Sequence, residues 1–134
     1  MVNSDGSIVW VAQSPTGTAW YSENNPCPAG WRVPTQTELQ SLVGAGSIWV
    51  IYNGVTGRLF GNAPNYIFLP AIGNRNSVTG AITFNNNGNY WSSTQSCPDT
   101  RWWAAYNLGL NPASGSVWSM DHSFGSLIRC VSKN

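Results

Sequence analysis

The sequence has 134 residues, of which 42% are hydrophobic and only 8% are charged, and its formal net charge is +1. This length suits one domain with one hydrophobic core, so we expect a single domain over residues 1–134. The low charge argues against nucleic acids and anionic membrane surfaces as partners, because both are bound through clustered Lys and Arg.

The first two predicted elements are short strands. Residues 7–13 are a continuous apolar run typical of a central strand, and residues 18–22 form a second strand after a Pro-Thr-Gly turn. Residues 24–30 are expected to be a rigid loop, because each proline fixes its own φ and favours an extended residue before it.

The strongest helix signal covers residues 36–43. Thr35 suits the N-cap, and Glu38 three residues later completes a capping box. Three apolar side chains follow at helical spacing: Leu39, Leu42 and Val43. Glycines at positions 44 and 46 predict the end of the helix.

The middle of the chain is harder to assign. Residues 48–52 form either a helical segment or a strand, and the pattern does not decide between them. Residues 54–65 are rich in Gly and Asn and predict a loop, whereas residues 66–72 predict a buried strand. Residues 74–80 are turn-like, and residues 81–84 predict a short strand.

The C-terminal half predicts a set of antiparallel strands. A hairpin-type loop is expected at residues 85–88, where Asn and Gly tolerate positive φ. The strands that follow are residues 90–94, 103–110, 116–120 and 126–132. From position 105 to 110, small or polar residues alternate with larger ones, which predicts one buried face. Short strands around one early helix indicate an α+β domain with a small antiparallel core.

The three cysteines are Cys27, Cys97 and Cys130, and an odd number cannot be fully paired within one chain. We expect a Cys27–Cys130 pair, because each lies in a framework-like stretch, which leaves Cys97 free. The alternative is that both are reduced and buried as small hydrophobic residues. No Cys/His cluster has the spacing of a metal site, and we expect no metal and no cofactor.

Two segments near the C-terminus, residues 95–103 and 118–124, have neither strand nor helix periodicity. They combine large aromatic residues with single charges, a cysteine and a histidine. Such a composition suits a recognition surface, where aromatic residues and Arg provide anchors. The alternative is an irregular loop with a few core tryptophans, and the composition does not choose between the two.

Catalysis and calcium binding both lack the residues they need. Asp121 and His122 are adjacent, so on a strand their side chains would point to opposite faces, which does not suit a Ser/His/Asp triad. Cys97 has no helix N-terminus or close basic residue to activate it. Asp99 and Asp121 are the only carboxylates in the C-terminal half, too few for a calcium ion. We therefore expect a protein that is not an enzyme.

Seven of the eight tryptophans fall into two expected groups. Trp102 and Trp118 are expected to be exposed, because they lie in the irregular segments. Five are expected in the core: Trp10, Trp20, Trp31, Trp91 and Trp103. We also expect structural roles for Arg32 and Arg129. The expected partner of each is Glu38 or a backbone carbonyl.

Four pieces of the chain carry a resemblance to a known family: residues 27–39 (CPAGWRVPTQTEL), 69–75 (LPAIGNR), 88–94 (GNYWSST) and 128–131 (IRCV). Together they resemble the Fibrobacter succinogenes major paralogous domain, a bacterial branch of the C-type lectin-like fold. The likeness covers nearly the whole chain after about residue 8. It implies short helices packed on small antiparallel sheets, termini close together, a helix starting at Thr35 and a Cys27–Cys130 bridge.

Within this fold, one group uses its C-terminal half as a variable ligand-binding surface that retroelements diversify by mutagenising adenines. By this resemblance, residues 8–94 and 125–132 would be framework and residues 95–124 a candidate variable region. The ligand-binding residues would be Gln95, Ser96, Cys97, Pro98, Asp99, Thr100, Arg101, Trp102, Asn107, Gly109, Trp118, Met120, Asp121, His122, Ser123 and Phe124.

We therefore expect a non-catalytic, calcium-independent domain that binds a protein or another surface ligand. The sequence leaves open whether the domain forms oligomers. The alternative is a structural cell-surface or adhesin-stalk module without a ligand site. The expected location is extracellular, on a bacterial surface or a phage virion. The first seven residues lack the basic and apolar parts of a signal peptide, so we expect a removed signal or export by another route, for example within a virus particle. No apolar run reaches the ~18 residues of a transmembrane helix, so no membrane insertion is expected.

Overall fold

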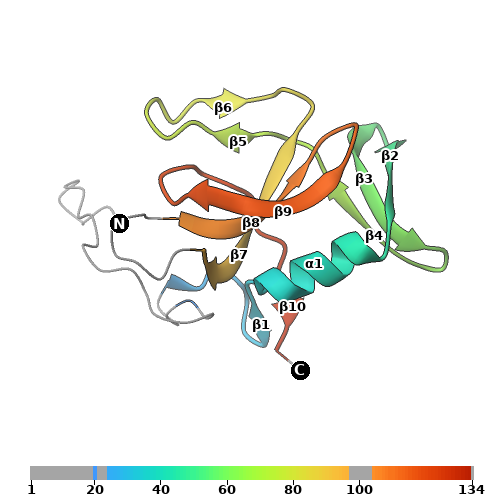
Figure 1. Ribbon diagram of the computed structural model, residues 1–134, viewed down its shortest axis with the longest axis horizontal. Helices are drawn as coiled ribbons and strands as arrows, with labels where there is room; N and C mark the ends of the chain where they lie inside the picture. The colour runs from blue at the N-terminus through green and yellow to red at the C-terminus, as the bar shows by residue number, and fades with distance from the viewer. Residues whose placement is uncertain (1–19, 21–23, 97–103, 134) are drawn as a thin grey trace.

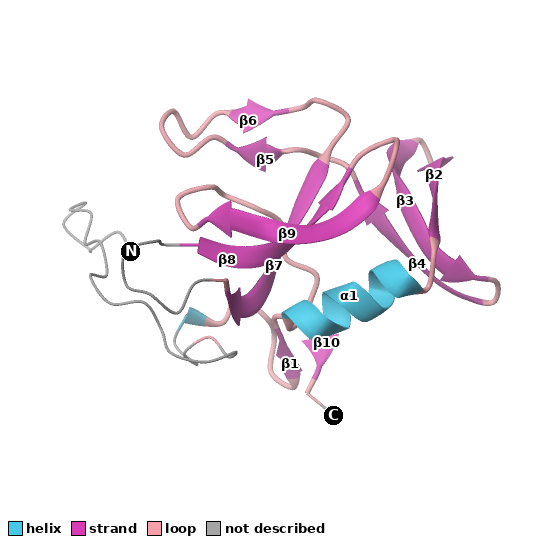
Figure 2. Cartoon of the chain, viewed as in Figure 1, coloured by secondary structure: helices cyan, strands magenta, loops and turns pink. Residues whose placement is uncertain are grey.

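The computed structural model describes residues 20, 24–96 and 104–133, and its elements are labelled in Figure 1. Within this part of the chain there are one α-helix and ten strands (Figure 2). In chain order they are β1 (Trp31–Arg32), α1 (Gln36–Gly44), β2 (Ser47–Tyr52), β3 (Val55–Asn62), β4 (Asn65–Pro70), β5 (Asn74–Arg75), β6 (Ile82–Thr83), β7 (Gly88–Gln95), β8 (Ala104–Leu110), β9 (Gly115–Asp121) and β10 (Val131–Ser132). The α+β class is confirmed.

Two three-stranded antiparallel sheets form the body of the molecule. One has the order β2-β3-β4 and the other the order β7-β8-β9, and two smaller ribbons pair β1 with β10 and β5 with β6. Helix α1 packs against all three strands of the β7-β8-β9 sheet and touches β3 (Figure 1). The sheet that carries most of the predicted site therefore rests on the helix.

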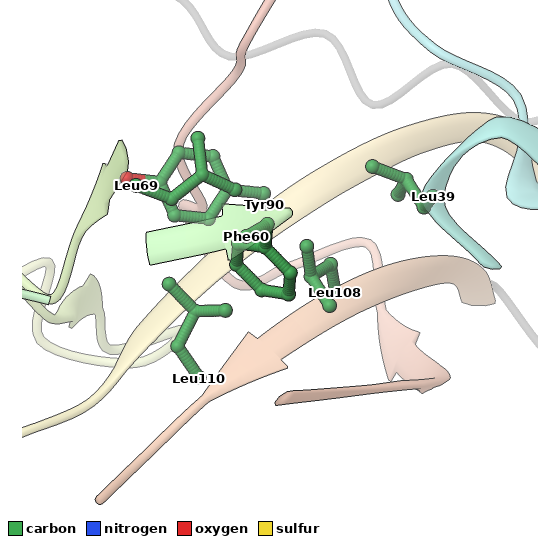
Figure 3. Close-up of a cluster of buried hydrophobic side chains, with 6 residues drawn as sticks. All are labelled: Leu39, Phe60, Leu69, Tyr90, Leu108 and Leu110. Atoms are coloured by element: carbon green, nitrogen blue, oxygen red, sulfur yellow. The ribbon is translucent and has the colours of Figure 1, made fainter. Parts of the chain in front are cut away.

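One hydrophobic core joins the helix to both large sheets. Its six buried side chains come from α1, β3, β4, β7 and β8, as Figure 3 shows: Leu39, Phe60, Leu69, Tyr90, Leu108 and Leu110. The hydroxyl of Tyr90 donates a hydrogen bond of 2.7 Å to the carbonyl of Pro70, which ties β7 to the end of β4. Burial raises the pKa of Tyr90 above its usual range, so the phenol stays protonated.

The start of α1 follows the predicted capping box. The backbone N–H of Thr35 donates to Glu38 Oε2 at 2.8 Å, and the backbone N–H of Glu38 donates to Thr35 Oγ1 at 3.3 Å. Arg32 donates two further hydrogen bonds, of 2.7 and 2.6 Å, to the two carboxylate oxygens of Glu38. Thr94 on β7 also accepts from the backbone N–H of Gln36 at 3.0 Å. The helix start is thereby fixed to both the chain before it and the sheet beneath it.

This carboxylate makes the stability depend on pH. The Arg32 guanidinium is the main cause that lowers the pKa of Glu38 to about 2, from 4.5. Because the pKa of Glu38 is lower in the folded protein, its carboxylate stabilises the fold fully above pH ~4.5. This stabilisation is lost as the pH falls towards ~2 and the carboxylate becomes protonated. We expect Glu38→Gln to flatten the fall in unfolding free energy over this window. Both side chains are more than a third exposed (36% and 40%), so screening limits the effect to below ~1 kcal/mol.

Urea unfolding at pH 7, 4.5 and 2.5 measures this effect. Arg32→Gln is the matched control, because it removes the main cause of the shift and leaves the carboxylate in place. It should flatten the same window, with a smaller remaining slope from the bonds to Thr35. Equal pH slopes in the wild type and Glu38→Gln would contradict the assignment.

The predicted loop over residues 54–65 is wrong. Most of this range is β3, which forms a hairpin with β2 through the two residues Asn53 and Gly54. Both turn residues have positive φ, of 50° and 79°, as a type I′ turn requires. Residues 48–52, which the sequence left undecided, belong to β2. The Asn-Gly pair was the local signal for this hairpin.

Other predictions hold only in part. The loop at residues 85–88 does not close a hairpin, because β6 pairs with β5 and β7 pairs with β8. The strand predicted at residues 126–132 is reduced to β10, and Leu127 makes only an isolated bridge with Tyr90. Trp31 is 46% exposed rather than in the core, because β1 and β10 form a two-stranded ribbon at the edge of the molecule. The strand predicted at residues 7–13, most of that at residues 18–22, Trp10 and Trp103 lie outside the described residues.

Two segments far apart in the sequence meet at one place. Cys27 and Cys130 form a disulfide with a Cα–Cα distance of 5.9 Å, as predicted. Next to it, Trp31 and Arg32 pair with Ser132 and Val131. In the described part of the chain, no helix has both the length and the apolar character needed to cross a membrane.

Candidate functional site

Four of the predicted contact residues share one face of the β7-β8-β9 sheet. The register places Asn107 beside Trp118 on β9 and Trp91 on β7, and Ala105 beside Met120. Because side chains alternate along a strand, the residues on this face are Asn89, Trp91, Ala105, Asn107, Gly109, Ser116, Trp118 and Met120. We call it the Asn107 face. The opposite face carries Tyr90, Leu108 and Leu110 into the main core.

One end of the Asn107 face is covered by a second hydrophobic cluster. Trp91, Ala105 and Met120 are buried there, and the partly buried Trp20, Phe124 and Ile128 pack against them. The sulfur of Met120 accepts a hydrogen bond of 3.5 Å from the hydroxyl of Ser126. Met120 was predicted as a ligand-binding residue, but its side chain is only 8% exposed because Phe124 and Ile128, from the chain after β9, pack against its cluster. Trp91 and Trp20 are at least partly buried, as expected for core residues.

The other end of the face is open, and Trp118 dominates it. Its side chain is 46% exposed, as predicted, and the nitrogen edge of its indole approaches Gly109 on the neighbouring strand. A Cβ added to Gly109 would collide with the indole nitrogen. The absence of a side chain at position 109 is therefore what lets the indole come so close to β8.

Asn107 lies between these two ends of the face, and its burial is unexpected. It is completely buried (0% exposed), although it was predicted to contact a ligand. Neither its side-chain oxygen nor its side-chain nitrogen has a hydrogen-bond partner among the residues that the structure describes. An unpaired buried amide is costly and uncommon in folded proteins. Its neighbours Trp91 and Trp118 flank it on the two adjacent strands.

This orphan amide leads to a stability prediction. Replacing Asn107 with Leu, which has a similar shape and no polar atoms, is expected to raise the free energy of unfolding by about 1–2 kcal/mol. Asn107→Asp is the control, and it should destabilise the protein because it buries a carboxylate without a partner. Urea unfolding of the two variants at pH 7 measures the difference. A loss of stability in Asn107→Leu would mean that the amide has a partner in solution.

The turn after β9 uses predicted contact residues for its own structure. The backbone N–H of Ser123 donates to Asp121 Oδ1 at 2.8 Å, and the backbone N–H of Phe124 donates to the carbonyl of Asp121 at 3.3 Å. The bond from Ser123 is the main cause that lowers the pKa of Asp121. The carboxylate is thus a turn-forming group that remains charged at neutral pH.

His122 lies on the rim of the second cluster. Its ring packs edge-on against Trp91, with 6.4 Å between ring centroids, while the residue as a whole stays exposed. Loss of water on the packed side lowers the pKa of His122, against the opposing effects of Asp121 and the backbone of Ala104. The imidazole is therefore mainly neutral at pH 7, and its packing indicates a structural contact.

The remaining described residues lie at the same end of the sheet. Gln95 pairs with Ala105, the backbone N–H of Ser96 donates to the carbonyl of Ala104, and the hydroxyls of Ser96 and Ser119 are 2.6 Å apart. The predicted residues that fall outside the described part of the chain are Cys97, Pro98, Asp99, Thr100, Arg101 and Trp102. Asn89 and Ser116 were missed, although two-residue periodicity along β7 and β9 would have placed them on the Asn107 face.

Two surface hollows lie away from the Asn107 face. One, of about 520 Å³, is lined by Cys27, Arg32 and Lys133, and the other, of about 380 Å³, lies beside α1. In the described part of the chain no group of three or more His, Cys, Asp or Glu residues could hold a metal ion. No protein-family model matches the sequence, and no curated protein or solved structure matches it.

Proposed function

We propose that this protein is a non-catalytic, calcium-independent binding domain whose ligand contacts the open end of the Asn107 face. The observation that carries the proposal is the indole of Trp118, which is half exposed and is held on β9 with its nitrogen edge against Gly109 of β8. A tryptophan held in this way offers a large apolar area with little conformational entropy to lose on binding. A rigid sheet supported by a helix is a suitable platform for such an anchor.

We further propose that the scaffold is a C-type lectin-like domain diversified by a retroelement, displayed outside the cell or on a phage particle. Support comes from the helix that begins after Thr35, the Cys27–Cys130 bridge and the grouping of Asn107, Gly109 and Trp118 on one face. A structural disulfide is typical of oxidising compartments. Sequencing this gene from many cells of one population tests the proposal: substitutions should concentrate at adenines in codons 95–124, and an even spread would overturn it.

Binding itself is tested with a pair of matched variants. Trp118 and Trp31 are both 46% exposed, but only Trp118 lies on the Asn107 face. Fluorescently labelled protein is titrated onto a panel of intact bacterial strains. On strains that the wild type binds, Trp118→Ala should weaken binding at least tenfold, whereas Trp31→Ala should leave it unchanged. Equal behaviour of the two variants, or no binding to any strain, would overturn the proposal.

A structural surface module is the second candidate, and specific contacts favour it. Met120 and Asn107 are buried, Phe124 is partly buried, and Asp121 holds its own turn, so much of the predicted contact set serves the fold. Under this alternative Trp118 would be tolerant of substitution. The same pair of variants therefore separates the two functions.

A further inference from the structure

The second large sheet has one face whose side chains are all aliphatic or aromatic, with two tyrosine hydroxyls as the only polar groups. From the register of β2, β3 and β4, the residues on this outer face are Ile48, Val50, Tyr52, Val55, Gly57, Leu59, Gly61, Tyr66, Phe68 and Pro70. We call it the Tyr52 face. The opposite face sends Phe60 and Leu69 into the core. An antiparallel sheet with one buried face normally turns polar residues to solvent on the other, so this face departs from the expected pattern.

The Tyr52 face is both exposed and well ordered. Ile48, Tyr52, Val55 and Tyr66 are exposed large hydrophobic residues. The ring of Tyr52 packs on Phe68 with 5.2 Å between centroids, and the Phe68 ring lies over Gly57, 2.7 Å from where a Cβ would be. Contiguous exposed apolar patches of this kind mark sites of association.

The charges around this sheet point to an uncharged partner. Arg58 is the only charged residue in positions 47–74. It is buried on the core side, where its guanidinium donates to the carbonyl of Asn111 at 2.8 Å and to the hydroxyl of Ser47 at 2.9 Å. The Tyr52 face therefore offers no charge to attract an oppositely charged partner. Two identical copies can also approach each other here without like-charge repulsion.

The regular strand pairing of the β2-β3-β4 sheet indicates what shape of partner would fit the Tyr52 face. All six residues of β2 pair with β3, and six consecutive residues of β3 pair with β4, without a bulge. An apolar face of a regularly paired sheet packs well against another such face, at a separation of about 10 Å. An identical face related by a two-fold axis meets this requirement, because an isologous interface uses the same patch twice.

We propose that two copies of this protein associate face to face through the Tyr52 face. Three strands about 4.8 Å apart and six residues of about 3.4 Å give a flat area of roughly 300 Å² per copy. The two copies together bury well under about 1,200 Å², which places the pair among weak, transient associations. The dissociation constant of the dimer is expected to lie in the high micromolar range.

Sedimentation equilibrium from 10 µM to 1 mM tests this proposal. The average mass of the wild type should rise with concentration towards that of a dimer. Ile48→Lys places a charge on the Tyr52 face and should weaken the association at least tenfold, and Val55→Lys is a second variant with the same expected effect. Ile51→Lys is the control: Ile51 is even more exposed than Ile48 (74% against 60%) and is on the same strand, but it points to the opposite face.

Thermal unfolding of each variant checks that it is folded before its mass is interpreted. The proposal is overturned if the wild type stays monomeric at 1 mM. It is also overturned if Ile51→Lys weakens association as much as Ile48→Lys, or if the mass grows beyond a dimer.

Discussion

Replacing both Cys27 and Cys130 with serine is expected to lower the free energy of unfolding by about 4–5 kcal/mol. The disulfide joins residues 103 positions apart. In the chain-entropy model, a cross-link that closes a loop of about a hundred residues lowers the conformational entropy of the unfolded chain. This loss raises the free energy of the unfolded state by the amount given above. A domain of this size has a total stability of only about 5–15 kcal/mol, so the double variant should be close to unfolded at 37 °C.

Urea unfolding with and without dithiothreitol measures the contribution of the disulfide. The reduced wild type should unfold at the same urea concentration as the double variant, and the double variant should not respond to the reductant. A wild-type midpoint that does not move on verified reduction of the bond would contradict the prediction.

Phe60→Ala is the second change with a large expected effect. Phe60 is buried on β3 among the side chains that join α1 to both large sheets, and its ring also lies beneath Gly115 at the start of β9. Removing the ring leaves a cavity that the two sheets cannot close without moving together. We expect a loss of about 3–5 kcal/mol in unfolding free energy.

Phe84→Ala is the matched control for this cavity. The chemical change is the same, but Phe84 is an exposed residue next to β6. Its substitution should change the unfolding free energy by less than ~0.5 kcal/mol. Chemical unfolding of both variants gives the comparison, and a cost below ~1 kcal/mol for Phe60→Ala would show that the core is not shared by the two sheets.

The parts of the fold that local interactions decide were predictable from the sequence. Thr35 and Glu38 are three residues apart and form their capping box without help from the rest of the chain. The β2–β3 hairpin was equally local, but the many Gly and Asn residues around Asn53 and Gly54 were interpreted as a loop. A glycine inside a strand can leave room for an aromatic ring on the next strand. Gly57 does so here for the ring of Phe68.

Burial in the candidate site was harder to predict, because it depends on contacts between distant segments. The alternation along β8 predicted a strand with one buried face, yet Leu108 and Asn107, on opposite faces, are both completely buried. The chain after β9 packs Phe124 and Ile128 on part of the second face, and no pattern within β8 reports this. The exposure of Trp118 was predicted correctly, although Trp118 lies within β9 and not in the irregular segment that the prediction assumed. The two-residue period placed Asn107 and Gly109 on one face but could not show what covers it.

The position of the disulfide also determines how the domain responds to mechanical force. A pulling force that enters the chain at Cys27 and leaves at Cys130 passes directly through the covalent bond between them. The residues in between, which include α1 and both large sheets, form a closed loop that carries none of this tension. If the domain is loaded through these two positions while it holds a ligand, α1 and both large sheets are expected to keep their shape, because the disulfide carries the load.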